Sequence, residues 1–141
     1  MFKINAEQLR AFQPDADEAF VRRVTEYLLE NHPDAEARLA RNRFSVTALP
    51  VEKLREMIRG GLERAREHGI HWKSTLLAFV VLMFLAAPNF DEHLKAARFF
   101  RENETVDDER FENFVAEMSD DDWTAVEAAY DETGWRIGAE L

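Results

Sequence analysis

The apolar residues of this chain recur at intervals of three and four positions, which is the pattern of helices that pack on one face. Phe20, Val24 and Leu28 show it after Asp15, and a second apolar line follows Pro50. No segment shows sustained alternation of polar and apolar residues, and no Asn-Gly or Asp-Gly pair signals a hairpin turn. The pattern therefore predicts an all-α fold.

Short polar residues that can cap a helix mark most of the expected helix starts, because their side chains accept hydrogen bonds from the first free backbone amides. The expected starts are the pairs Asn5/Gln8 and Asp15/Glu18, the single residues Pro50 and Ser74, and the pairs Asn89/Glu92, Thr105/Asp108 and Ser119/Asp122. The ends are expected at His32-Pro33, at Gly69 as a C-terminal cap, and at Pro88. These signals predict six or seven helices.

The longest uncharged apolar stretch, TLLAFVVLMFLAA at residues 75–87, is shorter than the ~20 residues that a helix needs to span a bilayer. We expect a buried helix at about 74–87, with the other helices around it. The Gly60-Gly61 pair costs about 1 kcal/mol per glycine in a helix, so either the helix kinks there or a neighbour packs closely against the bare backbone. We favour close packing against that central helix. The prediction is one helical domain over residues 1–141, with a frayed tail from about residue 133.

Composition excludes several classes of protein. The 141 residues include no cysteine, which removes disulfides and thiolate metal sites. A net charge of −10 argues against a nucleic-acid binder and against docking on an anionic membrane. The N-terminal residues lack the apolar run of a secretory signal, so we expect a cytoplasmic protein.

The negative charge is concentrated at one end of the sequence. Residues 1–70 carry 12 basic and 12 acidic side chains, whereas residues 102–132 carry 13 acids and a single base, Arg110. Residues 38–66 instead hold eight bases against three acids. This imbalance indicates a functional acidic surface that attracts a basic protein, although a purely solvated face is the alternative. The basic segment 38–66 could itself meet the acidic segment, within one molecule or in a homodimer.

The candidate partner-binding residues come from this acidic segment and the aromatic residue that follows it. They are Asp107, Asp108, Glu112, Asp120, Asp121, Asp122 and Trp135. Trp123 and Tyr130 are further aromatic candidates, with Trp123 more typical of a core position. Since Trp135 follows a glycine in the expected frayed tail, we expect it to be exposed.

Catalytic signatures are absent from the sequence: it has no glycine-rich phosphate loop, no G-x-S-x-G and no H-E-x-x-H. His68 and His71 flank Gly69, which is expected to end a helix between them, so they need not share a face. The run Asp120-Asp121-Asp122 lacks the alternating spacing of a calcium loop and fits the first turn of a helix. We expect no catalytic, cofactor or metal site.

The strings IRGGLERAREHGI (58–70) and FVVLMFLAAPNFD (79–91) resemble segments of a group of small, uncharacterised bacterial proteins. In that group a helix ending in Gly-Ile precedes an F-V-x-L-M-F-type helix and a G-P-x-F-D-like turn, where this chain has Ala87 in place of the glycine. Such proteins are often encoded beside type VI secretion spike and effector genes. The likeness covers about a quarter of the chain and transfers no catalytic residue.

The resemblance implies an immunity protein that neutralises a cognate effector, or alternatively an adaptor that handles an effector before export. The acidic segment offers immunity a mechanism, since it can cover a basic active-site cleft such as that of a nuclease. A third hypothesis is an enzyme with an unrecognised site. A deep polar pocket that holds His68 or His71 beside several carboxylates would favour that third hypothesis.

Overall fold

Helices make up most of the computed structural model, which describes the backbone of residues 6–137 and the side chains of residues 18–137. The α-helices of this part of the chain are α1 (Ala6–Asn31), α2 (Val51–Glu67), α3 (Lys73–Leu85), α4 (Leu94–Glu102), α5 (Asp108–Glu117) and α6 (Asp120–Ala128). Two short 3₁₀ helices, η1 (Phe90–Glu92) and η2 (Glu132–Trp135), and a hairpin of β1 (Glu36–Leu39) and β2 (Asn42–Ser45) complete it. The all-α prediction is confirmed.

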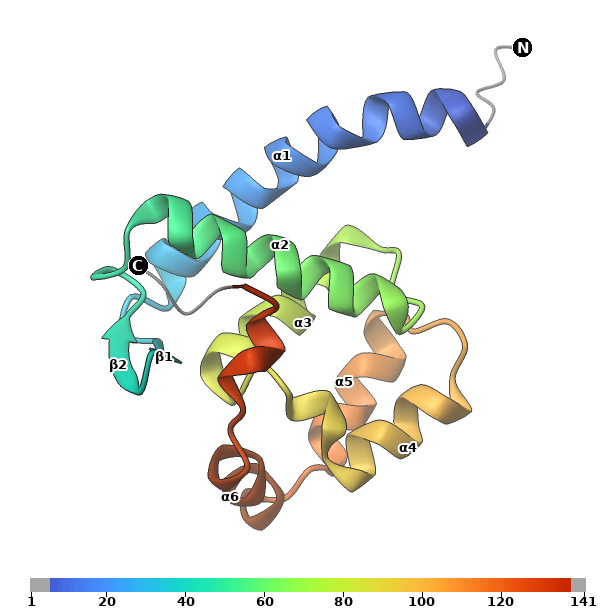
Figure 1. Cartoon of the computed structure of the whole chain (residues 1–141). Coiled ribbons are helices and arrows are strands. Elements are labelled where there is room, and N and C mark those ends of the chain that lie inside the picture. The colour runs from blue at the N-terminus through green and yellow to red at the C-terminus, as the bar shows by residue number, and fades with distance from the viewer. Residues whose placement is uncertain (1–5, 138–141) are drawn as a thin grey trace.

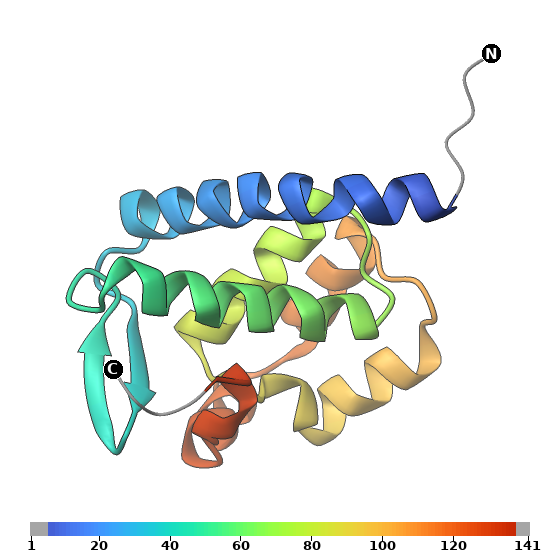
Figure 2. The same cartoon turned by 45° about the horizontal axis from the view of Figure 1, so that its top comes forward.

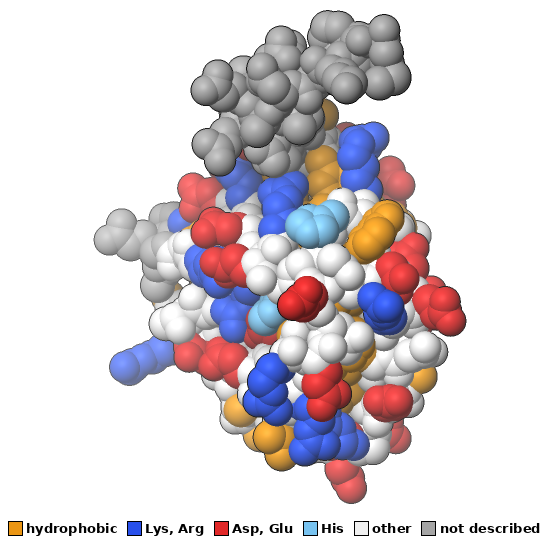
Figure 3. Space-filling model, turned by 90° about the vertical axis from the view of Figure 1, so that its right-hand side faces the viewer, with side chains coloured by type: hydrophobic (Ala, Val, Ile, Leu, Met, Phe, Trp, Pro, Cys, Tyr) orange, Lys and Arg blue, Asp and Glu red, His pale blue; other side chains and the backbone are white. Residues whose placement is uncertain are grey.

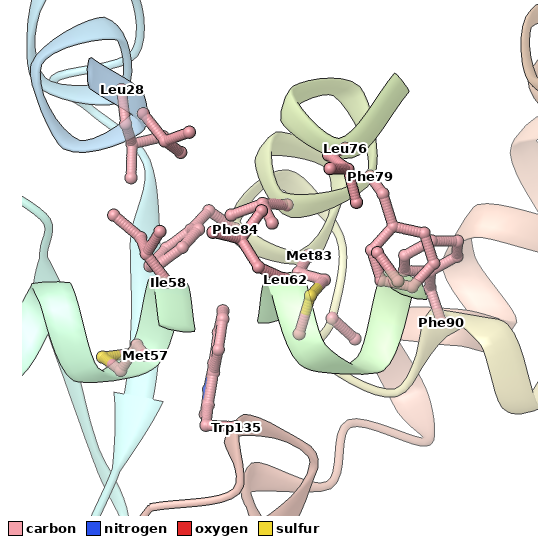
Figure 4. Close-up of a cluster of buried hydrophobic side chains, with 14 of the residues drawn as sticks. Leu28, Met57, Ile58, Leu62, Leu76, Phe79, Met83, Phe84, Phe90 and Trp135 are labelled. Atoms are coloured by element: carbon pink, nitrogen blue, oxygen red, sulfur yellow. The ribbon is translucent and has the colours of Figure 1, made fainter. Parts of the chain in front are cut away.

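Helices α1 and α3 both pack against α2, and α4, α5 and α6 lie beyond them on one side of the molecule (Figure 1, Figure 2). The amphipathic line of α2 explains its central place, because Leu54, Met57, Ile58 and Leu62 are all buried. Figure 4 shows Ile58 and Leu62 near Phe84 and Met83 of α3 and near Trp135, and all of these residues belong to one apolar core.

The Gly60-Gly61 pair lets other elements approach α2 closely, as expected. A Cβ atom on Gly61 would lie 2.9 Å from the Met83 sulfur and 3.2 Å from a Val80 methyl group, both on α3. A Cβ atom on Gly60 would collide with the backbone oxygen of Trp135. Both glycines therefore serve packing, one against the central helix and one against η2.

The N-terminal part departs from the prediction in two ways. The two helices expected there are one, since α1 runs from Ala6 to Asn31 and Asp15 lies inside it. The Asn5 cap lies outside the described residues. A proline inside a helix removes one backbone hydrogen bond and can be accommodated, so Pro14 does not have to end the helix.

The second departure is the hairpin, which the sequence prediction missed. Ala40 and Arg41 form its two-residue turn with φ of 51° and 66°, the left-handed values that a type I′ turn requires and that Asn and Gly favour. Ala37 and Leu39 are buried against the core, so tertiary packing stabilises a turn that local preference does not. The short alternation in Glu36–Leu39 was the available signal.

Three helix starts were also assigned to the wrong residue. Helix α3 begins after Trp72 without a side-chain cap, and Ser74 is not its cap. The cap of α4 is His93 instead of Asn89, and the cap of α5 is Asp107 instead of Thr105. The Ser119 capping box with Asp122 is as predicted. Helix α2 ends at Glu67 with His68 as its C-cap, and the predicted Gly69 follows that cap in the left-handed conformation, with a φ of 82°.

Candidate functional site

Three of the predicted partner-binding carboxylates hold the local structure of α5 and α6 together. Asp107 accepts a hydrogen bond of 2.9 Å from the Arg110 amide at the start of α5. Asp108 accepts hydrogen bonds from the Thr75 hydroxyl and, at 2.7 Å, from the Ser74 hydroxyl, and these bonds lower the pKa of Asp108. Asp108 therefore fastens α5 to the start of α3.

Asp122 is the third of these carboxylates. The Lys95 ammonium donates to it at 2.6 Å, and the Ser119 amide donates at 2.8 Å within the capping box. The hydrogen bond from Lys95 and those from Ser119 lower the pKa of Asp122 to about 2. Asp122 joins α6 to α4, so its charge is already matched within the molecule.

The remaining predicted carboxylates are Glu112, Asp120 and Asp121, and their environment differs from that of Asp107, Asp108 and Asp122. All three are exposed, and none makes an ion pair with another residue of the described part of the chain. Asp120 and Asp121 sit in the first turn of α6, where their charge complements the helix dipole. We call Glu112, Asp120 and Asp121 the acidic surface. Among the residues whose side chains are described, its charges have no ion-pair partner that a binding protein would have to displace.

The expectation of an exposed Trp135 is wrong. Its side chain is completely buried, and its ring centroid lies 4.5 Å from that of Phe84 (Figure 4). The indole Nε1 donates to the Tyr130 hydroxyl at 3.1 Å. The chain from 133 to 137 is thus folded onto α2 through η2 instead of fraying, and Trp135 anchors the C-terminal segment to the core.

Tyr130 marks the place where the basic and acidic segments meet. Its hydroxyl accepts a hydrogen bond of 3.0 Å from the Arg38 amide, and the Arg38 guanidinium lies 4.5 Å from its ring centroid. Burial raises the pKa of the Tyr130 hydroxyl. This contact uses the hairpin and the end of the acidic segment, and leaves the acidic surface itself uncovered.

The basic residues of α2 pair mainly with carboxylates outside the acidic segment. Arg59 pairs with Glu18 at 2.6 Å, and Arg55 pairs with Glu52 at 2.9 Å. Over α4 and α5 the basic and acidic side chains are interspersed on the surface (Figure 3). The segregation of charge along the sequence is therefore only partly kept in space, and the basic segment does not neutralise the acidic one.

The second cluster of charged groups lies where α2 ends against η1. Arg64 donates two hydrogen bonds of 2.6 Å to Asp91, and His68 Nε2 lies 2.6 Å from the same carboxylate. The Asp91 side chain is only 4% exposed. Burial alone would raise the pKa of Asp91, but the hydrogen bonds from His68 and Arg64 outweigh it and hold that pKa below its ordinary value.

His68 stacks on Phe100 with ring centroids 4.1 Å apart and borders an open hollow of about 430 Å³ that Glu67 and Glu104 also line. The enzyme hypothesis requires a polar pocket in which a histidine lies beside carboxylates, and this hollow has such a histidine in His68. However, both oxygens of Asp91 already hold Arg64 and His68, and the described residues that line the hollow include no serine, threonine or cysteine. His71 is exposed and takes no part, as the position of Gly69 indicated.

The sequence interpretation missed Arg64 and Asp91. Arg64 lies in the last turn of α2 and His68 is the C-cap residue four positions later, so they face one direction, and that spacing was the available signal. Their common partner is 23 residues beyond His68, and no local pattern indicates it. Among the residues described by the structure, no three His, Asp or Glu side chains are grouped so that they could hold a metal ion.

Comparisons with protein-family models, curated proteins and solved structures give no match to this chain. In the described range 6–137, no helix combines the length and apolarity that crossing a membrane requires.

Proposed function

We propose that this chain is a cytoplasmic, non-catalytic binding protein of a bacterial secreted-toxin locus, which neutralises a cognate effector through its acidic surface. The observation that carries this proposal is the contrast among the acidic residues of α5 and α6. Asp107, Asp108 and Asp122 are engaged within the fold, whereas Asp120 and Asp121 point their charge to solvent without an ion-pair partner among the described residues.

Unpaired carboxylates at the surface favour a basic partner for two reasons. Their field raises the rate of encounter with a positively charged protein. Within residues 18–137 they also have no ion pair that would break when the partner covers them, so binding does not have to offset a lost contact there. A basic active-site cleft, which the effector of such a locus would present if it acts on nucleic acid, fits both conditions.

Co-expression with the toxin encoded beside the gene tests the proposal. We expect the wild-type chain to rescue cell growth and to form a one-to-one complex whose association slows as salt is added. The double variant Asp120→Lys/Asp121→Lys should weaken that complex by about tenfold or more, because close charge pairs across interfaces are worth more than about 1.5 kcal/mol.

The matched control is Glu52→Lys/Glu56→Lys, which changes the net charge equally on α2, where both residues are exposed in pairs with Arg55 and Lys53. This control should bind as the wild type does. If the α6 double variant binds unchanged and with unchanged salt dependence, the acidic surface is a solvated face and the proposal fails. Failure to rescue, together with loss of secretion on deletion, would assign the adaptor role instead.

A further inference from the structure

Helix α3 is apolar all around from Leu76 to Leu85, yet the described residues cover only part of its circumference. Ala78 and Leu85 are exposed, and Leu82 is half-buried between them. Together with Val115 and Ala116 of α5 and Tyr27 of α1, they line a groove of about 530 Å³. Leu85 is 49% exposed and Tyr27 is 40% exposed. The expectation that the central helix is enclosed on every side is thus wrong along this groove.

The arrangement of these residues is that of a helix-packing surface. Ala78, Leu82 and Leu85 are spaced i, i+4 and i+7, so they form one stripe about 10 Å long on α3. Small residues on both walls, Ala78 and Ala116, leave room for inserted side chains. Contiguous apolar grooves on a folded chain commonly mark interaction sites, because water contact with apolar area costs about 25 cal/mol per Å².

We propose that this groove binds an amphipathic helix with a basic flank, supplied by the partner protein of the proposed function, on which this inference rests. A groove between two helices accepts a third helix that presents apolar residues at i, i+3 or i+4, and i+7. The negative charge of α5 favours basic residues on the flank of the bound helix. Glu112 lies in the groove wall, Glu109 and Glu117 are exposed on the same helix, and Arg110 is its single base.

The same charges disfavour the other occupants of an apolar groove. A second copy of this chain also carries a net charge of −10, so two acidic grooves facing one another would repel. An anionic lipid surface is repelled for the same reason. A basic amphipathic helix is stabilised in the groove by two interactions. Its leucines replace water at the apolar stripe, and its lysines contact the α5 carboxylates.

The test uses three fluorescein-labelled helical peptides of equal length. The first has leucines at i, i+3, i+4 and i+7 with lysines elsewhere, the second replaces the lysines with glutamates, and the third replaces the leucines with serines. Fluorescence anisotropy against the full chain measures their binding. We expect the first peptide to bind at least about tenfold more tightly than either of the others, since affinity requires both the apolar stripe and the basic flank.

Ala116→Arg places a long cationic side chain in the groove wall and should weaken binding of the leucine–lysine peptide by about tenfold or more. Ala19→Arg is the matched control, because Ala19 is exposed on α1 and does not line the groove, and it should leave the affinity unchanged. Circular dichroism melts of both variants verify that each is folded. Equal binding of all three peptides, or wild-type affinity of Ala116→Arg, overturns the inference.

Two further results separate this inference from the proposed function. If the toxin complex depends on Asp120 and Asp121 but Ala116→Arg binds the toxin normally, the groove proposal fails alone. If the peptide results are as expected while α6 charge reversal leaves the toxin complex unchanged, the proposed function fails and the groove keeps its helix specificity. A concentration-dependent dimer in sedimentation, removed by Ala116→Arg, would make the groove a self-interface and overturn the proposal.

Discussion

The end of α2 and the first turn of α6 use the same kind of residue for different purposes. At the end of α2 the Asp91 carboxylate is 4% exposed and is held by Arg64 and His68. At the start of α6 the carboxylates of Asp120 and Asp121 are exposed and make no ion pair with another described residue. A buried, ionised carboxylate without partners would lower the stability of the fold by several kcal/mol. The burial of Asp91 therefore depends on its contacts with Arg64 and His68.

This difference shows how burial separates structural charge from charge that is available for binding. The Arg64–Asp91–His68 cluster connects α2 to η1 and has little left to offer a ligand, since both Asp91 oxygens are used. Asp122 stands between the two cases, because it is bonded to Lys95 and Ser119 but lies near the surface. The following variants test this comparison, in order of decreasing effect.

Replacing Asp91 by asparagine should lower the free energy of unfolding by about 3 kcal/mol, near the low end for breaking a buried ion pair. The low end applies because Glu92 remains 3.2 Å from the Arg64 guanidinium. Urea denaturation measures the loss. Glu92→Gln, whose side chain is 59% exposed, is the control and should cost less than about 1 kcal/mol. Equal losses in the two variants would mean that burial does not distinguish these carboxylates.

The stability difference between the wild type and Asp91→Asn should depend on pH. The pKa of Asp91 is lower in the folded chain than its ordinary value of 3.8, so its contribution is complete above that value and is lost as the pH falls through the folded pKa. Urea midpoints measured between about pH 6 and pH 2 should therefore converge for the two proteins at the acidic end. A difference that stays constant over that range would contradict an ionised Asp91 in the fold.

Removing the hydroxyl of Ser119 should cost about 1 kcal/mol, because the Asp122 amide at the start of α6 loses its capping acceptor. Ser74→Ala provides the comparison, since Ser74 does not cap α3 and only donates an exposed hydrogen bond to Asp108. Its cost should be about 0.5 kcal/mol. Thermal unfolding of both variants measures the difference, and a larger loss for Ser74→Ala would be inconsistent with these roles.

Neutralising the α6 carboxylates with Asp120→Asn/Asp121→Asn should have the smallest effect on folding, within about 0.5 kcal/mol of the wild type. Both side chains are exposed, so they make little contribution to stability apart from their interaction with the α6 dipole. Asp122 lies in the same first turn and keeps part of that interaction in the variant. Urea denaturation of the double variant measures it. A loss comparable to that of Asp91→Asn would show that these carboxylates belong to the folded structure and are not reserved for a partner.

Prediction from the sequence succeeded where the interactions are local. The Ser119 capping box, the end of α2 just before Gly69 and the buried stripe of α2 all involve residues within a few positions of one another. It failed where competing local signals needed a distant contact to decide between them. Thr105 and Asp107 can both cap α5, for example, and in the fold it is the Asp107 side chain that accepts the capping hydrogen bond.

The candidate site divides in the same way. Seven partner-binding residues were predicted from charge and aromatic character, but these properties do not reveal which charges already have partners. Asp108 meets Ser74 and Thr75 across 33 or more residues, and Trp135 packs on Phe84, so both are committed to the fold. The hairpin turn at Ala40 and Arg41 escaped prediction because its residues do not favour the left-handed conformation that the fold imposes.

The sequence alone determined the helical character of this protein, the apolar character of α3 and the concentration of negative charge in residues 102–132, because periodicity and composition are properties of the chain itself. The tertiary structure decided which carboxylates are paired, buried Trp135 of η2 against α2 and α3, and left a groove open along α3. The reason is that pairing and burial depend on which surfaces meet in space, and those surfaces come from segments that lie tens of residues apart.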